Sequence, residues 1–257
     1  MMEPVQPTSL LKFSNVRKTY ESEYGEPLLA LDALDISIEK NEIVVLLGPT
    51  GCGKTTALNM ALGLESPDTG TVLLGEEVIR GRNMPCVFQH YTLFPWRNIL
   101  RNVTFGLEMN GVSRKESEER ALGLLESVGI SFFANSQPHE LSGGMRQRAA
   151  IAQALAVDPR LLLMDEPFGA LDDATRNELQ KTLIEIWKEQ KFSILFVTHS
   201  IDEAIILGTR IIVMSARPGK VAKEFGVELP WPRDITSKPF TSLLVKIRQT
   251  LARQIAE

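Results

Sequence analysis

The stretch "EIVVLLGPTGCGKTTALNMALGL", Glu42–Leu64, contains the clearest structural signal in this chain of 257 residues. Its first residues are apolar without alternation, which is typical of a strand buried on both faces of a parallel sheet. A glycine-rich segment follows, and the stretch then continues as the helical "TTALNMALGL". The order strand, glycine-rich loop and helix predicts an α/β fold with a phosphate-binding loop.

The loop "GPTGCGKTT" matches the pattern G-x-x-x-x-G-K-[ST]. Its glycines allow a tight backbone turn whose N–H groups point at the α- and β-phosphates of a nucleotide. Lys54 is expected to reach the β- and γ-phosphates, and the Thr55 hydroxyl to bind Mg²⁺. The alternative is a glycine-rich turn followed by an unrelated lysine, and the strand–loop–helix context argues against it. The nucleotide-binding residues expected here are Gly48, Pro49, Thr50, Gly51, Cys52, Gly53, Lys54, Thr55 and Thr56.

Three further apolar runs have the same character, at Arg160–Glu166, Ser193–His199 and Arg210–Ala216. Each is short, rich in branched aliphatic residues and followed by a turn or helix signal, so we expect more strands of one parallel sheet. Helical patterns lie between these runs. "SRKE" (Ser113–Glu116) and "SIDE" (Ser200–Glu203) have the spacing of capping boxes, which predicts that a helix starts at each.

The N-terminal part has a different pattern. In "LDALDISIEKNE" the apolar residues Leu34, Ile36 and Ile38 alternate with polar ones. Such alternation is typical of a half-buried strand in an antiparallel sheet. "ESPDTGTVLLG" adds a turn followed by another short strand.

Composition and charge narrow the class of protein. Hydrophobic residues make up 44% of the chain and charged residues 23%, as in a soluble globular protein. The net charge of −4 argues against broad nucleic-acid binding, which usually needs a basic surface. Two cysteines and three histidines give neither a disulfide scaffold nor a convincing zinc site, and a reducing, cytosolic setting fits better. No apolar run approaches ~18 residues and the start lacks a signal-peptide pattern, so we expect any membrane role to come through a partner.

Two carboxylates follow a predicted buried strand in "LLLMDEP". Successive strand residues point in opposite directions, so Asp165 can address Mg²⁺ while Glu166 addresses a water beside the γ-phosphate. A solvated acidic turn is the alternative for an isolated match. His199 also ends a predicted strand, and a contact with the γ-phosphate is weighed there against a structural role.

The segment "HELSGGMRQRAAIAQALA", His139–Ala156, predicts a second site for an anion. A helical run opens there on Ser142, Gly143 and Gly144, and free N–H groups at a helix start attract negative charge. The alternative is an ordinary helix cap followed by a place where small residues pack closely.

Together these motifs resemble the ATP-binding cassette (ABC) ATPases. The phosphate-binding loop is followed by Gln89 in "CVFQHY", then by "LSGGMRQR", "LLLMDEP", "ALD" (Ala170–Asp172) and finally His199. The resemblance covers about Leu11–Pro218, and the ordered set is far more specific than any single motif. It implies an α/β P-loop NTPase (RecA-like) parallel-sheet core with an N-terminal antiparallel β subdomain and an inserted helical lobe.

The resemblance also implies an organisation of the chain. Residues 1–257 are expected to form a single ABC ATPase domain. The nucleotide-binding core with its antiparallel subdomain takes residues 11–89 and 159–216, and the helical signature lobe takes residues 90–158. Residues 217–257 form a short C-terminal tail that contains one amphipathic helix.

The family's dimer assigns a role to the "LSGG" segment. In such ATPases two cassettes pack head to tail and sandwich two ATP molecules, so each chain brings two half-sites. The resemblance therefore implies that Ser142, Gly143 and Gly144 contact the γ-phosphate bound by a second copy of the chain or by a homologous cassette. It also implies that Asp172 links the two sites. Met145 is a departure, because the family's commonest form has glutamine at that position.

The remaining site residues follow in the same way. Tyr20 of "RKTY" stands where these ATPases stack an aromatic ring on adenine, although packing near a hairpin is an alternative. Glu166, His199, Gln89 and Lys54 are the implied catalytic residues, with ATP and Mg²⁺ as cofactors. The implied Mg²⁺ ligands are Thr55, Gln89 and Asp165.

Several segments look most like the nitrate/sulfonate/taurine importer branch: "HYTLFPWRNILRNVTFGLE" (His90–Glu108), "DEPFGALDDATR" and "MSARPGK". This branch implies transmembrane permease subunits as partners, a solute-binding protein acting indirectly, and a place at the cytoplasmic face of the membrane. Phe94 and Trp96 either dock a partner or pack inside the helical lobe. The alternative functions are an exporter or lipid-extraction ATPase and a non-transport ABC protein; an ordinary P-loop kinase or GTPase has no use for "LSGG".

Overall fold

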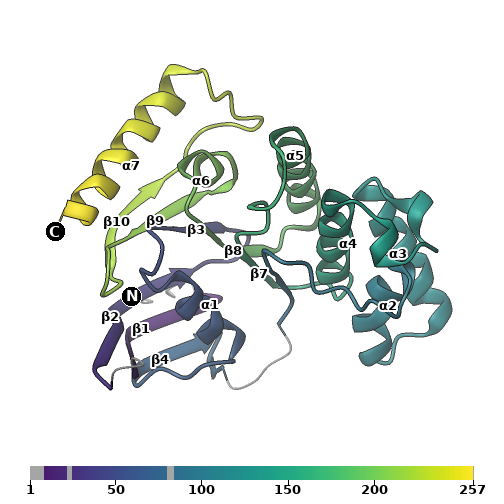
Figure 1. Ribbon diagram of the computed structural model, residues 1–257, viewed down its shortest axis with the longest axis horizontal. Helices are drawn as coiled ribbons and strands as arrows, with labels where there is room; N and C mark the ends of the chain where they lie inside the picture. The colour runs from purple at the N-terminus through teal and green to yellow at the C-terminus, as the bar shows by residue number, and fades with distance from the viewer. Residues whose placement is uncertain (1–8, 22–24, 80–83, 257) are drawn as a thin grey trace, which may run out of the picture. The chain divides into compact units, whose positions relative to one another are not determined.

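The computed structural model describes residues 9–21, 25–79 and 84–256 (Figure 1). The chain divides into two compact units. The first comprises Met1–Asn83 and Ser193–Glu257, and the second comprises Met84–Phe192. We describe each unit by itself.

The first unit contains an antiparallel sheet in the order β2-β1-β4-β5. These strands are β1 (Leu11–Glu21), β2 (Pro27–Ile38), β4 (Thr69–Leu74) and β5 (Glu77–Val78). Leu34, Ile36 and Ile38 of β2 are all buried, and Ile36 lies opposite Phe13 of β1. The alternating pattern therefore identified the buried face of this sheet correctly.

The same unit contains four strands in the order β10-β9-β3-β8. They are β3 (Ile43–Leu47), β8 (Ser193–Thr198), β9 (Arg210–Met214) and β10 (Val221–Gly226). β3 runs parallel to β8 and β9, whereas β10 pairs antiparallel with β9. All five residues of β3 are buried, as predicted for a strand covered on both faces.

Three helices cover these strands. They are α1 (Lys54–Leu62), α6 (Ile201–Leu207) and α7 (Lys238–Ala256). α1 contacts β2 and β8, and α6 contacts β3, β8 and α7. Figure 1 shows α1 on one side of the strands and α6 with α7 on the other. The phosphate-binding loop connects the end of β3 to the start of α1.

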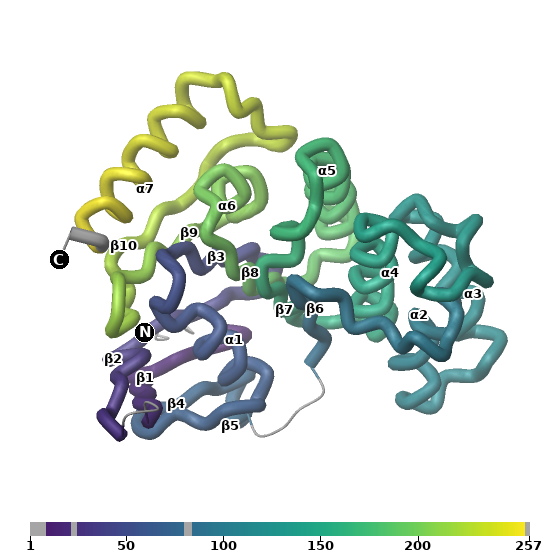
Figure 2. Tube along the Cα trace, in the orientation of Figure 1, coloured from purple at the N-terminus to yellow at the C-terminus, as the bar shows by residue number. Residues whose placement is uncertain are grey.

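The second unit pairs two short parallel strands with a group of helices (Figure 2). The strands are β6 (Cys86–Val87) and β7 (Leu161–Asp165). The helices are α2 (Ile99–Met109), α3 (Arg114–Ser127), α4 (Gly143–Leu155) and α5 (Asp173–Gln190), with short 3-10 turns η1 (Ser131–Phe133) and η2 (Pro138–Glu140). α4 contacts α2, α3, α5 and β6, so it lies at the centre of this unit.

Both predicted helix starts are confirmed. The Ser113 side chain accepts a hydrogen bond from the Glu116 N–H at the start of α3, at 3.4 Å. Ser200 accepts from the Glu203 N–H at the start of α6, at 3.3 Å. The Glu203 carboxylate accepts from the Thr198 hydroxyl at 2.6 Å, so it also ties α6 to the end of β8.

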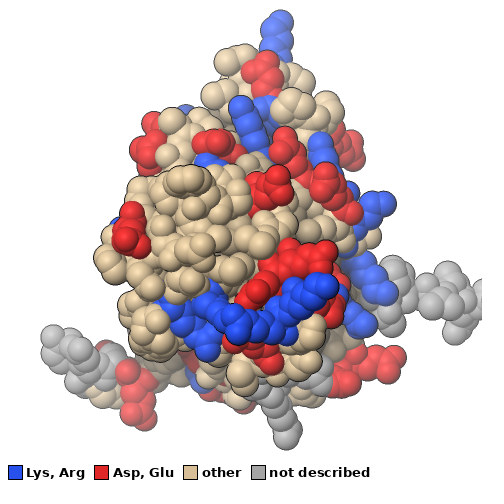
Figure 3. Space-filling view, turned by 90° about the vertical axis from the view of Figure 1, so that its right-hand side faces the viewer, with Lys and Arg blue, Asp and Glu red and all other residues tan. Residues whose placement is uncertain are grey.

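Two further properties concern membrane spans and the distribution of charge. Among the described residues, no helix is both long and apolar enough to cross a bilayer. On the face in Figure 3, basic and acidic side chains lie next to one another. Ion pairs of this kind join Arg114 to Glu118 and Arg120 to Glu116 along α3.

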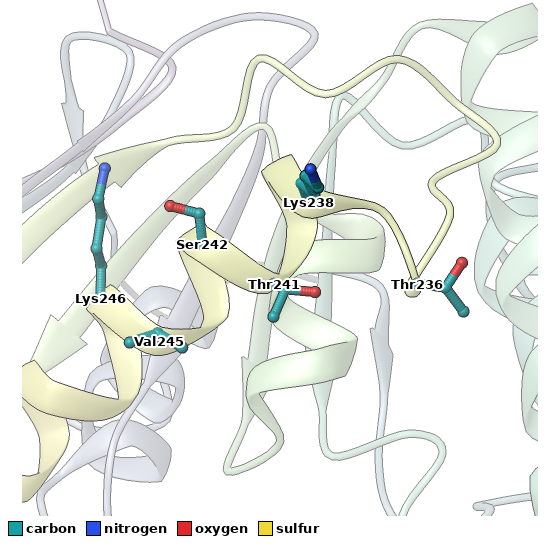
Figure 4. Close-up of a pocket in the computed structure, with 6 residues that line it drawn as sticks. All are labelled: Thr236, Lys238, Thr241, Ser242, Val245 and Lys246. Carbon is teal, nitrogen blue, oxygen red and sulfur yellow. The ribbon is translucent and has the colours of Figure 1, made fainter.

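An open groove of about 460 Å³ runs along the start of α7 (Figure 4). None of the residues predicted for the nucleotide site contributes to it. Hydroxyl and ammonium side chains with a single valine line it: Thr236, Lys238, Thr241, Ser242, Val245 and Lys246.

Candidate functional site

The loop between β3 and α1 depends on glycine at defined positions. Gly51 and Gly53 have φ angles of 78° and 91°, a left-handed region in which glycine is unstrained. A Cβ at Gly53 would lie 2.5 Å from Leu31 Cδ2, and one at Gly48 would lie 2.7 Å from Cys52 Sγ. The backbone therefore approaches its surroundings more closely than any side chain permits, as in a phosphate-binding loop.

The Lys54 side chain is buried inside the curve of this loop. Its Nζ donates to the carbonyl oxygens of Gly48, at 2.8 Å, and Pro49, at 3.0 Å. Thr55, next in the chain, is exposed in the first turn of α1. The loop thus places a fixed ammonium and an exposed hydroxyl at the start of a helix, and groups of this kind bind phosphate and its metal.

Tyr20 adjoins the start of α1. Its hydroxyl donates to the Glu65 carboxylate and lies 3.3 Å from Thr56 Oγ1. Burial and the bond to Glu65 raise the pKa of Tyr20 above its usual value, so the phenol stays protonated. These bonds fix the position of the ring beside Thr56 at the start of α1.

His199 lies at the same strand edge as the loop. In the parallel pair β3–β8, Leu47 lies opposite Thr198, so Gly48 and His199 leave the sheet from adjacent positions. The Thr198 hydroxyl donates to Glu203 and accepts from the Ser200 N–H, at 3.0 Å. Thr198 and Glu203 therefore hold the turn that presents the exposed His199 side chain; our sequence interpretation took Glu203 only as part of a helix cap.

In the second unit, Gln89 and the two carboxylates come together. β6 and β7 are parallel, with Val87 opposite Met164, so both strands end at one edge. A Cβ at Gly169, in the turn after Glu166, would lie 3.2 Å from the Gln89 amide nitrogen. Burial and, second to it, the negative charge of Asp165 raise the pKa of the Cys86 thiol to about 12.

Glu166 has a left-handed backbone, with φ at 44°. A residue with a Cβ pays a conformational cost in that region, and such residues concentrate at functional sites. The Gly169 N–H donates to the Glu166 carbonyl oxygen at 3.0 Å and closes the turn. The strain directs a half-buried carboxylate away from the direction that a regular strand residue would take.

The start of α4 shows both features that we considered for "LSGG". Ser142 caps the helix, with its Oγ accepting from the Met145 N–H at 3.3 Å. A Cβ at Gly144 would lie 2.6 Å from Thr175 Cγ2, so this glycine is required by packing. A Cβ at Gly143 would meet no atom within 4 Å. Packing within the chain therefore explains Gly144 but not Gly143.

Asp172 caps α5 beside this helix start. Its carboxylate accepts from the Thr175 N–H at 3.0 Å and from the Thr175 hydroxyl at 2.8 Å. The hydrogen bond from the Thr175 N–H and, to a smaller extent, the one from its hydroxyl lower the pKa of the Asp172 carboxyl. Thr175 thus touches both Asp172 and the Gly144 backbone, which places Asp172 near the exposed Ser142 and Gly143.

The residues singled out in the sequence therefore form one group in the first unit and two groups in the second. The first unit groups Tyr20, the loop 48–56 and His199. The second groups Gln89 with Asp165 and Glu166, and Asp172 with the start of α4. Among the described residues, no group of three or more His, Cys, Asp or Glu side chains could hold a metal ion alone. Each unit does contain oxygen atoms of the kind that Mg²⁺ prefers: the Thr55 hydroxyl in the first, and the Gln89 amide and Asp165 carboxylate in the second.

The aromatic residues after Gln89 have different environments. The Phe94 ring is half-buried, with its centre 4.7 Å from that of Phe105 and 5.6 Å from that of Trp96. Trp96 is 75% exposed. The interpretation in which both rings pack inside the helical lobe is therefore wrong for Trp96.

The sequence is similar to a family model and to several curated proteins. Residues 31–169 match the family model described as ABC transporter. An uncharacterised ABC transporter ATP-binding protein of Methanocaldococcus jannaschii is 44% identical over 95% of this chain and 92% of its own length. The taurine import ATP-binding protein TauB of Rhizobium johnstonii is 44% identical, over 85% of this chain and 84% of its own. The nitrate import ATP-binding protein NrtD of a Synechocystis strain is 41% identical, over 86% and 83%.

A solved structure agrees with the fold. The dimeric structure of a bacterial ABC transporter cassette matches with a TM-score of 0.76 at 33% identity, covering 85% of this chain and 99% of that one. The antiparallel sheet, the parallel strands and the helices described above are thus arranged in a known fold.

Proposed function

The chain belongs to the ABC transporter family as an ATP-binding subunit that hydrolyses ATP, and from this premise we propose that it powers an importer. The proposed cargo is a small anion such as nitrate, a sulfonate or taurine. The observation that carries this proposal is the similarity to taurine and nitrate import ATP-binding proteins along more than four-fifths of the chain.

In the proposed site, ATP lies on the loop 48–56 with its adenine against Tyr20. The buried Lys54 ammonium and the N–H groups of the loop neutralise the phosphates. Thr55, Gln89 and Asp165 are the residues that would hold Mg²⁺, which would supply further charge neutralisation to the phosphates.

Hydrolysis needs a positioned water. Glu166 orients that water and accepts its proton, which suits a carboxylate whose strained backbone fixes its direction. His199 donates a hydrogen bond to a γ-phosphate oxygen from the neighbouring strand edge. Phosphoryl transfer depends mostly on placement and charge stabilisation, and these side chains supply both.

A second copy of the chain completes each site. The exposed Ser142 and Gly143, at the start of α4, bind the γ-phosphate held by the partner's loop, with Asp172 alongside. Gly143 supports this assignment, because no contact within its own chain accounts for the missing side chain. ATP then favours the closed dimer because only that state lets both copies contact one γ-phosphate.

Closure of the dimer drives the transmembrane partners into their opposite-facing state. We propose that the exposed Trp96 and its neighbour Phe94 form part of the surface that docks permease subunits at the cytoplasmic face of the membrane. An exposed aromatic side chain of this kind is a common anchor in interfaces. Hydrolysis removes the shared γ-phosphate contact and lets the dimer reopen.

Glu166→Gln tests the ATPase part of the proposal. This variant keeps the shape of the side chain but cannot accept the proton, so we expect unchanged ATP binding, turnover below about 1% of wild type, and accumulation of dimers. Titration with a fluorescent ATP analogue measures binding, a phosphate-release assay measures turnover, and size-exclusion chromatography with ATP detects the dimers. Normal turnover in this variant would remove Glu166 from its role.

Purification from native membranes tests the transport part. A permease and a solute-binding protein that co-purify with the chain identify an importer, and ligand binding by that protein names the cargo. Co-purification of a single membrane protein without a binding protein identifies an exporter or lipid-extraction ATPase instead. Stimulation by DNA or ribosomes in place of a membrane partner indicates a non-transport ABC protein.

A further inference from the structure

The segment Phe88–Tyr91, which contains Gln89, is held against the first turns of α4 by two consecutive side chains. The Gln147 side chain is 2% exposed, and its Nε2 donates to the Phe88 carbonyl oxygen at 3.4 Å. The Arg146 guanidinium carbon lies 4.5 Å from the centre of the Tyr91 ring. These two contacts lie on either side of Gln89.

The Arg146 side chain makes a cation–π contact with the Tyr91 ring. Its Nε is buried and has no hydrogen-bond partner within the part of the chain that the structure describes, so this part of the guanidinium depends on the aromatic ring for compensation. Arg148, two residues further along α4, shows the ordinary alternative. It donates to the Val128 carbonyl oxygen at 2.8 Å and pairs with Glu178 at 2.7 Å. Arg148 anchors the helix itself, whereas Arg146 holds a different segment against it.

The other side of this segment faces the turn of the proposed catalytic base. The Gln89 amide nitrogen lies 3.2 Å from the position of a Cβ on Gly169, and the Gly169 N–H is bonded to the Glu166 carbonyl oxygen. The exposed Gln89 thus lies between two anchored stretches, with the Glu166 turn on one side and the contacts to the helix that Ser142 caps on the other.

We propose that Arg146 and Gln147 are positioning residues that fasten the Gln89 segment to the Ser142 helix, so that the two move as one body. This inference rests on the proposed function, in which Gln89 contacts the metal and phosphates of one site and Ser142 contacts the other. Docking of α4 on a partner's γ-phosphate then fixes the position of Gln89 in the same chain. The contact affects turnover and leaves the affinity of the loop 48–56 for ATP unchanged.

A double-mutant cycle between Arg146 and Tyr91 tests this proposal. Arg146→Ala and Tyr91→Leu each remove the same contact, so each should lower kcat about tenfold, and the double variant should lower it no further. Tenfold is the effect of about 1.4 kcal/mol, within the range of a partly buried cation–π contact. The Kd for ATP should stay within about twofold of wild type in all three variants.

Conservative variants separate positioning from folding. Tyr91→Phe keeps the ring and should retain most of the turnover, as should Arg146→Lys, which keeps a cation. Gln147→Glu has nearly the same shape but cannot donate to the Phe88 carbonyl oxygen, so kcat should fall while the Kd for ATP holds. Tyr91 is 38% exposed, so its replacement leaves the core intact if the Arg146 variants fail to fold.

The controls use matched residues outside the site. Phe132→Leu removes a ring that is 93% exposed, and Arg120→Ala removes an exposed arginine paired with Glu116. Both should turn over ATP like wild type. Thermal unfolding of every variant shows whether a loss of turnover follows a loss of stability.

Two results would overturn the proposal: kcat losses of Arg146→Ala and Tyr91→Leu that multiply in the double variant, or a Tyr91→Leu variant with wild-type kcat. The Glu166→Gln variant, assayed alongside, distinguishes failure of the proposed function from failure of the positioning role alone. If it hydrolyses ATP normally, the proposed function fails. If it stalls and the cycle is additive, only the positioning role fails.

Discussion

The neighbouring glycines at the start of α4 allow a prediction that separates a packing role from a binding role. Gly144 faces Thr175, and an added Cβ would lie 2.6 Å from its Cγ2. Thr175 cannot turn away without breaking its hydroxyl bond to Asp172. Gly143 has no atom within 4 Å of the position of an added Cβ. The same substitution, glycine to alanine, therefore has different consequences at two adjacent positions.

For Gly143→Ala we expect the free energy of unfolding to rise by no more than about 1 kcal/mol, because alanine has the higher helix propensity. Its ATPase rate should fall about 100-fold, because the methyl group enters the space proposed for the γ-phosphate and costs at least one N–H contact. For Gly144→Ala, overpacking of about 2 kcal/mol exceeds the propensity gain of about 1 kcal/mol, so the variant should lose about 1 kcal/mol of stability.

Urea unfolding followed by circular dichroism measures the stabilities, and phosphate release at saturating ATP measures turnover. Gly123→Ala is the matched control, since this glycine lies inside α3 with nothing within 4 Å of an added Cβ. It should be more stable by up to about 1 kcal/mol and fully active. Wild-type turnover in Gly143→Ala would refute the binding role, and an unchanged stability of Gly144→Ala would refute the packing argument.

Three further predictions concern single side chains. Lys54→Ala removes the ammonium from the centre of the loop and should raise the Kd for ATP at least tenfold, measured by titration with a fluorescent ATP analogue; unchanged affinity contradicts the loop assignment. The pKa of Asp172 is lowered in the folded chain, so its contribution to stability is present above pH ~4 and is lost as acid protonates it. The difference in unfolding midpoint between wild type and Asp172→Asn should accordingly shrink from pH 6 to pH ~3, and a constant difference contradicts this role. Burial and, second to it, the charge of Asp165 raise the pKa of the Cys86 thiol to about 12, so Cys86 in the folded chain should react only slowly with iodoacetamide at pH ~8. Mass spectrometry measures the extent of labelling, and rapid labelling of Cys86 would contradict this environment.

Local pattern was sufficient to predict several elements of the fold, although not β1, β6 or β10. The unbroken apolar run of β3 requires cover on both faces, and the alternation of β2 requires one buried face, whatever the rest of the chain does. The side chains of Ser113 and Ser200 accept hydrogen bonds from N–H groups that have no partner within the helix. The helix starts could therefore be predicted from the sequence. These effects operate over a few residues, and a short stretch of sequence contains all of their causes.

The candidate site was only partly predictable for the opposite reason. The motifs identified the residue types, but the register that sets Leu47 opposite Thr198 and so brings His199 beside the loop comes from strand pairing far apart in the chain. The left-handed φ of Glu166 and the contrast between Gly143 and Gly144 depend on neighbours that only the folded chain supplies. No spacing rule links Arg146 to Tyr91 either, since their contact joins segments more than fifty residues apart. The sequence alone determined which chemistry the chain carries, because motifs encode local geometry. The tertiary structure alone decided which side chains meet, because long-range packing sets distances that local preferences do not specify.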